Sequence, residues 1–108
     1  MKPDVLDVLS WQISAIRDSM SGISLPMWLG ETSSAYGGGA RHLSDRFVAG
    51  FMWLDKLGLA ARMGVSIVVR QSLTGGYYAL LDKKMNPLPV SSISKNSVFS
   101  ETISVIYS

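Results

Sequence analysis

The sequence predicts an α/β fold in which a helix, a strand, a second helix and a second strand follow one another along the chain. Two segments carry apolar residues three and four positions apart, the spacing of one face of a helix. Two short apolar runs bounded by turn residues are typical of strands buried in a parallel sheet. A helix that joins two strands forms a βαβ step, so we expect parallel neighbouring strands with a right-handed connection.

The first helix and the first strand are expected in the first 30 residues. The apolar residues that would share one helical face are Leu6, Leu9, Ile13, Ile16 and Met20. Ser21 and Gly22 break this pattern. Residues 25–30 are mostly apolar, and we expect a strand there that ends next to Glu31.

The second helix is expected to follow a glycine-rich loop. Ser44 is of the type that caps the amino terminus of a helix, and Gly64 suits the carboxyl-terminal cap. Charged residues interrupt residues 47–63, and about 20 apolar residues are needed to cross a bilayer. We therefore expect a buried amphipathic helix and no transmembrane segment. Its apolar face would be formed by Phe47, Phe51, Leu54 and Ala61.

The second strand and the tail complete the chain. Residues 65–69 are rich in β-branched residues and predict the second strand. Residues 90–108 are rich in Ser, Ile and Val, and residues 98–107 are β-prone with few charges. We expect the tail to be disordered or to form a stray strand.

The composition restricts the function classes. Hydrophobic residues make up 47% of the 108 residues and charged residues only 17%. The net charge of +2 gives a mild basic bias, which suits a polyanionic substrate but does not predict nucleic-acid binding. The sequence holds no Cys and one His, His42, so no metal site is expected. We interpret Arg41 and His42 as a solvated surface pair.

Glu31 is the residue that most favours catalysis. It follows an apolar strand, and in β/α enzymes the reacting side chains sit at the carboxyl ends of parallel strands. A retaining glycosidase uses one carboxylate as nucleophile and a second as acid/base, and Glu31 would supply one of them. The alternative is that Glu31 caps a loop or forms an ion pair.

A glycine-rich loop and two tyrosines would accompany Glu31. Glycines at 37–39 can take positive φ and turn backbone N–H groups toward an anion such as a uronate or a sulfate. Tyr36 and Tyr78 each offer a ring for a sugar face and a hydroxyl for a sugar oxygen. The alternatives are a plain flexible loop and ordinary core packing of the tyrosines.

A long stretch of the chain resembles the heparanases, endo-β-glucuronidases of glycoside hydrolase family 79 that cleave heparan sulfate. The matching segments include WLGETSSAYGGGA at 28–40 and residues 43–45, 49–59, 61–64, 68–71, 75–78 and 86–89. The resemblance covers residues 3 to about 89. It implies that residues 1–89 are the last two βα units of a (β/α)8 TIM barrel, so that the chain is a partial barrel with a divergent tail at 90–108.

The resemblance also implies roles for individual residues. Glu31 would be the catalytic nucleophile. Saccharide contacts would be made by Tyr36, Gly37, Gly38, Gln71, Gly76 and Tyr78. The retaining mechanism needs no cofactor, so none is expected. The family's acid/base is the Glu of an Asn-Glu pair, and this dipeptide does not occur in the sequence. Glu101 is not a convincing replacement.

These expectations lead to a function at two levels. The family-level function is hydrolysis of heparan sulfate or a related sulfated glycosaminoglycan in lysosomes or outside cells. The chain has no visible signal peptide, and a complete barrel takes about 250 residues. We therefore expect the 108 residues alone to be inactive and to require the rest of the barrel from a parent chain. Three alternatives remain open: a saccharide-binding or decoy fragment, a gene product without function, and an exo-acting β-glucuronidase.

Overall fold

A computed structural model describes residues 6–95 and 104–107 of the chain. The elements follow the order α2 (Val8–Ser19), β1 (Met27–Thr32), α3 (Phe47–Arg62), β2 (Val65–Arg70), α4 (Pro89–Lys95) and β3 (Ser104–Tyr107). The predicted order of helix, strand, helix and strand is confirmed for the first four elements. Each strand extends one or two residues beyond its predicted carboxyl end, so Glu31 lies inside β1.

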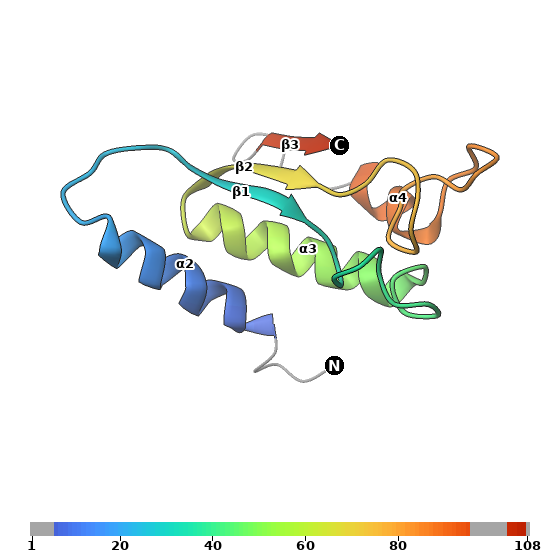
Figure 1. Cartoon of the computed structure of the whole chain (residues 1–108), viewed down its shortest axis with the longest axis horizontal. Coiled ribbons are helices and arrows are strands. Elements are labelled where there is room, and N and C mark those ends of the chain that lie inside the picture. The colour runs from blue at the N-terminus through green and yellow to red at the C-terminus, as the bar shows by residue number, and fades with distance from the viewer. Residues whose placement is uncertain (1–5, 96–103, 108) are drawn as a thin grey trace.

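The described residues form one parallel sheet with the strand order β1-β2-β3 (Figure 1). β1 and β2 are parallel, as predicted for a βαβ step, and β3 pairs with the other edge of β2. This mixed α/β arrangement confirms the predicted fold class. The larger barrel stays a prediction, because the described residues include only these three strands.

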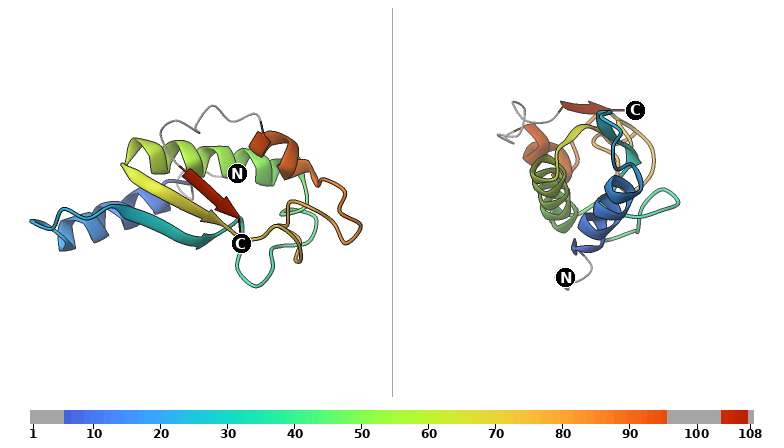
Figure 2. Two further views of the ribbon diagram at one scale, coloured as in Figure 1. Left: turned by 90° about the horizontal axis from the view of Figure 1, so that it is seen from above. Right: turned by 90° about the vertical axis from the view of Figure 1, so that its left-hand side faces the viewer.

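Both long helices lie on the same side of the sheet (Figure 2). The core between α3 and the sheet contains Trp53, Leu57, Ala60, Val65 and Val68, and Ile13 of α2 joins it. The prediction of the buried face of α3 was wrong for Phe47 and Phe51, whereas Ala61 packs against the core. Phe47 and Phe51 are exposed, because the face toward the sheet is the stripe that begins at Ala49 and continues through Trp53, Leu57 and Ala60.

One predicted helix end is correct and the other is wrong. Gly64 follows α3 with φ of 72°, and its N–H donates to the Ala61 carbonyl, as a glycine after a helix commonly does. Ser44 does not cap the helix, because α3 begins three residues later, at Phe47. The buried Ser44 hydroxyl instead accepts a hydrogen bond from the Ala40 N–H at 2.9 Å and another from the Ser34 hydroxyl at 2.7 Å. It therefore organises the glycine-rich loop.

The tail holds more structure than the sequence predicts. Residues 89–95 form α4, which begins at Pro89, a residue well suited to the first turn of a helix. Val90 and Ser91 are buried, so this helix is attached to the rest of the molecule. Within the β-prone segment 98–107, residues 104–107 form β3, and residues 96–103 and 108 lie outside the described part. None of the helices in the described residues is long and apolar enough to cross a membrane.

Candidate active site at the carboxyl ends of β1 and β2

The carboxyl ends of β1 and β2 bring Glu31 and Gln71 together. The backbone N–H of Gln71 donates to the Thr32 carbonyl at 3.0 Å, which extends the pairing of the two strands by one residue. The Gln71 side chain then donates from Nε2 to Glu31 Oε1 at 3.0 Å. Residues 40 positions apart in the sequence thus meet because parallel strands end at the same edge of a sheet.

A local irregularity of β1 sets the direction of Glu31. Leu29 is paired with Val68 and Thr32 with Arg70, so β1 advances three residues while β2 advances two. The extra residue is accommodated at Gly30 and Glu31, where Glu31 takes a φ of 28°. Such bulges redirect a side chain and are common next to active sites. Glu31 is solvent-exposed at this position.

Most of the predicted site residues line one cavity next to Glu31. Its volume is about 420 Å³. Six of the seven predicted site residues belong to its lining: Glu31, Tyr36, Gly37, Gly38, Gln71 and Tyr78. The seventh, Gly76, is outside the lining but lies against Gly38. The structure therefore brings the predicted residues together, and their roles remain predictions.

Two glycine-containing loops meet at the edge of this cavity. The Tyr77 N–H donates to the Gly38 carbonyl at 2.6 Å. Gly76 has φ of 75°, and a Cβ placed on it would lie 2.7 Å from the Gly38 carbonyl oxygen. This approach is too close for any side chain, which explains why a glycine stands at position 76.

The two predicted tyrosines have different surroundings. Tyr36 is fully exposed, so its whole ring is open to a ligand. Tyr78 is only 7% exposed, and its backbone carbonyl accepts a hydrogen bond from Arg70 Nη2 at 2.8 Å. Tyr78 thus combines a core position with a place in the cavity lining.

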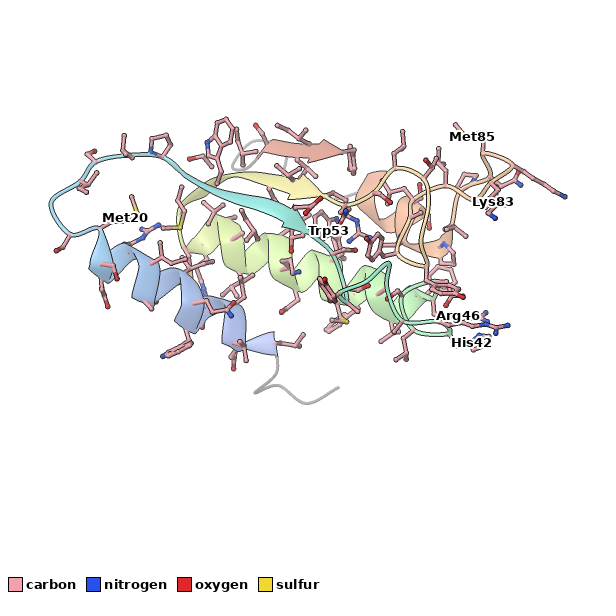
Figure 3. The ribbon with its side chains drawn as sticks, viewed as in Figure 1. Met20, His42, Arg46, Trp53, Lys83 and Met85 are labelled. Carbon is pink, nitrogen blue, oxygen red and sulfur yellow. The ribbon has the colours of Figure 1, made fainter. Side chains whose placement is uncertain are left out.

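Two cations lie beneath the strand ends, and sequence reasoning assigned no role to either. Lys56 Nζ donates to Thr32 Oγ1 at 2.7 Å and to the Ser33 carbonyl at 2.6 Å. The guanidinium of Arg70 lies 4.4 Å from the ring centre of Trp53. Figure 3 shows Trp53 pointing from α3 toward the sheet. The signal in the sequence was weak: Trp53 and Lys56 are three residues apart on α3, and Lys56 interrupts an apolar segment.

Burial changes the acidity of both cations. Burial, together with the nearby Arg70, lowers the pKa of Lys56 from 10.5 to about 8. Burial lowers the pKa of Arg70 to about 10, partly opposed by Tyr107 and Tyr78. A lysine with such a pKa changes its charge under mildly alkaline conditions, which an exposed lysine does not.

The predicted surface pair next to the glycines is exposed. Arg41 and His42 are both on the surface, and Arg46 Nη2 lies 3.3 Å from His42 Nδ1 (Figure 3). Arg46 Nε also lies 3.6 Å from Asp45 Oδ1. Neither Arg41 nor His42 belongs to the lining of the cavity next to Glu31. The structure therefore supports the interpretation as a solvated pair.

The chemistry that this arrangement can perform is set by its single carboxylate. Glu31 is the only acidic residue among those described residues that line the cavity. The Glu31 side chain accepts a hydrogen bond on Oε1 from the uncharged amide of Gln71, which fixes its orientation. Such a group can attack an electrophilic carbon. Glu101 lies outside the described residues.

Comparisons with known proteins agree on one family. Residues 1–58 match the glycosyl hydrolase family 79 N-terminal domain. The chain is 50% identical over 95 residues to a protein named heparanase from Bos taurus, a match covering 82% of this chain and 17% of the relative. It is 55% identical over 65 residues to a hyaluronoglucuronidase from Hirudo nipponia, covering 59% of this chain and 13% of the relative.

A third relative differs in its named activity. The chain is 38% identical over 92 residues to the protein named inactive heparanase-2 from Homo sapiens, a match covering 82% of this chain and 16% of the relative. The chain thus spans about a sixth of the length of the bovine and human relatives.

Proposed function

The chain belongs to glycosyl hydrolase family 79, and from this we propose that it carries the nucleophile and part of the saccharide site of a retaining endo-β-glucuronidase. The substrate would be heparan sulfate or a related sulfated glycosaminoglycan, encountered in lysosomes or outside cells. The similarity to heparanases and to a hyaluronoglucuronidase supports a glucuronide as the sugar that is cleaved.

The observation that carries the proposal is the Glu31–Gln71 pair. The carboxylate stands at the carboxyl end of a parallel strand, beside a cavity of about 420 Å³, and is held by Gln71 Nε2 at 3.0 Å. Oε1 is the oxygen that accepts this hydrogen bond, so Oε2 is the oxygen available for attack. Because this donor is a neutral amide, it orients the carboxylate without placing a compensating positive charge beside it.

The mechanism would follow the double displacement of retaining glycosidases. Glu31 Oε2 attacks the anomeric carbon of a glucuronosyl residue, and the bond to the leaving sugar oxygen breaks. A second carboxylic acid gives its proton to that oxygen and then, as a base, takes a proton from the water that releases the sugar from Glu31. Tyr36 would lie against a sugar face, and the N–H groups of Gly37 and Gly38 would meet an anionic group of the sugar.

We propose further that these 108 residues do not turn over substrate by themselves. The reaction needs two carboxyl groups about 5 to 5.5 Å apart. Among the described residues, the cavity lining offers only Glu31. The second carboxyl group would come from the rest of the (β/α)8 barrel, of which residues 1–89 would form the last two βα units.

A second candidate function is saccharide binding without chemistry. The single carboxylate in the described lining favours it, and so does the 38% identity to a relative named inactive heparanase-2. In this case Tyr36, the glycine loop and Tyr78 would hold a saccharide that is never cleaved.

The test uses the bovine heparanase as a carrier for this chain. Residues 3–89 replace the matching segment of that protein, and depolymerisation of heparan sulfate by the chimera is measured. Glu31→Gln is expected to lower kcat by at least about a thousandfold, because the nucleophile is lost. Binding of a heparan sulfate oligosaccharide should change by less than about threefold, because the side chain keeps its size.

The control variant is Lys83→Gln, since Lys83 is exposed, lies on a loop (Figure 3) and does not belong to the lining of the cavity next to Glu31. Its activity should equal that of the unmodified chimera. Full activity of the Glu31→Gln chimera would contradict the proposed nucleophile. A chimera that binds the oligosaccharide but never cleaves it would favour the binding function.

A further inference from the structure

Lys56 connects α3 to the two residues that follow Glu31. Its Nζ reaches Thr32 Oγ1 at 2.7 Å and the Ser33 carbonyl at 2.6 Å. Both distances are short for N–H···O bonds, as expected when the donor carries a charge. The side chain is partly buried, so solvent competes little for its N–H groups. One ammonium group, donated by α3, therefore holds the segment that immediately follows Glu31.

Glu31 needs such a constraint because its backbone is strained. Its φ of 28° lies in the left-handed region, which residues with a Cβ rarely adopt because it is energetically unfavourable for them. Strained residues persist only where their surroundings impose the conformation. Here the Gln71 N–H holds the Thr32 carbonyl, and Lys56 holds the Thr32 hydroxyl and the Ser33 carbonyl.

We propose that Lys56 is a positioning residue: its ammonium group holds the Thr32–Ser33 segment in the conformation that aims the Glu31 carboxylate at Gln71. The catalytic meaning of this position rests on the proposed function, whereas the structural coupling does not. Lys56 itself lies outside the lining of the cavity next to Glu31 and so acts through its neighbours.

At the end of β2, Arg70 likewise connects α3 to a loop of the candidate site. Its guanidinium lies over Trp53, and its Nη2 holds the Tyr78 carbonyl at 2.8 Å. Gln71, the donor to Glu31, is the next residue along the chain. Trp53 and Lys56 project from one side of α3, so this helix supports both strand ends of the site.

The charge of Lys56 gives the coupling a pH signature. Burial and Arg70 lower its pKa to about 8, so the ammonium loses a proton as the pH rises through that value. The neutral amine donates more weakly, and its hold on Ser33 weakens. The charged or titratable groups that bear on this titration are Arg70 of β2, which acts on Lys56, and Tyr78 and Tyr107, which act on Arg70.

The first experiment uses the 108-residue chain and needs no catalysis. The side-chain amide resonances of Gln71 are followed by NMR between pH 6 and 10.5. We expect them to titrate with a midpoint of about pH 8. In Lys56→Met this titration is lost and the Gln71 resonances move toward those of a solvated amide. Lys56→Arg keeps them near the wild-type position without the transition near pH 8.

Two further variants keep the test decisive. Lys83→Met removes an exposed lysine and should leave the titration unchanged. Thr32→Val removes one acceptor of Lys56 without removing its charge, and should displace the Gln71 resonances even if Lys56→Met does not fold. The proposal is overturned if Lys56→Met, or Thr32→Val in its place, leaves the Gln71 resonances and their titration unchanged.

The second experiment measures the catalytic consequence in the bovine chimera. Lys56→Met should lower kcat by about ten- to a hundredfold with KM within about threefold, because a misplaced nucleophile affects the transition state more than binding. Lys56→Arg should restore most of kcat. Equal losses in Lys56→Met and Lys56→Arg would contradict positioning. If Glu31→Gln keeps full activity, the proposed function fails, and the NMR titration still decides the role of Lys56.

Discussion

At the residue scale, the backbone conformation of Glu31 is set by the residues that surround it and not by the intrinsic preference of a glutamate. A glutamate disfavours a φ of 28°, yet the bulge in β1, the Gln71 side chain and the Lys56 ammonium impose it. Part of this could be predicted from the sequence, because an apolar run predicts a strand and so places Glu31 near a strand end. The bulge could not, since it depends on how β1 and β2 pair.

Gly76 provides a test of the contact between the two glycine loops. Gly76→Ala places a Cβ 2.7 Å from the Gly38 carbonyl oxygen, whereas Gly75→Ala meets nothing within 4 Å. Both residues have positive φ, so both substitutions carry the same backbone cost of about 1–2 kcal/mol. We expect Gly76→Ala to lower the free energy of unfolding further and to weaken saccharide binding. Urea denaturation and oligosaccharide titration of both variants measure this, and equal effects would exclude the contact.

At the element scale, side chains of α3 contact the strand ends that carry the candidate site, and β3 pairs with one edge of β2. The sequence predicted α3 but placed its buried face on Phe47 and Phe51, because the segment is apolar on several sides and periodicity alone does not select the face. The packing of Trp53 and Leu57 against the sheet selects it. The tail strand β3 pairs with β2 in register, with Val68 opposite Val105 and Arg70 opposite Tyr107.

Two neighbouring tail residues test whether β3 is packed on the core. Val105 is partly buried and contacts the core, whereas Ile106 is 46% exposed. Val105→Asp should lower the free energy of unfolding by about 1–3 kcal/mol and Ile106→Asp by less than about 1 kcal/mol. The midpoints of urea denaturation give both values. Equal midpoints for the two variants would show that β3 does not pack as described.

At the scale of the whole molecule, the sequence could predict the α/β fold class and residues that lie around one cavity, but not the side chains that support them. Helical spacing and short apolar runs sufficed for the order of α2, β1, α3 and β2, since local patterns determine these elements. Gln71 entered the predicted site through the family resemblance, and its hydrogen bond to Glu31 was found only in the structure. Lys56 and Arg70 gave no such pattern, because their contacts join residues far apart in the sequence. The helix α4 was missed because its burial, not its composition, stabilises it.

The central claim is that Glu31 becomes covalently bonded to a sugar. The most direct measurement treats the bovine chimera and the 108-residue chain with a 2-deoxy-2-fluoro glucuronoside whose leaving group departs without needing a proton. The fluorine slows release, so a glycosyl intermediate accumulates and can be found by mass spectrometry of tryptic peptides. We expect the adduct on Glu31, within the peptide of residues 18–41, and its absence in Glu31→Gln. An adduct on a different residue of the chimera, or an equal adduct in Glu31→Gln, would contradict the claim.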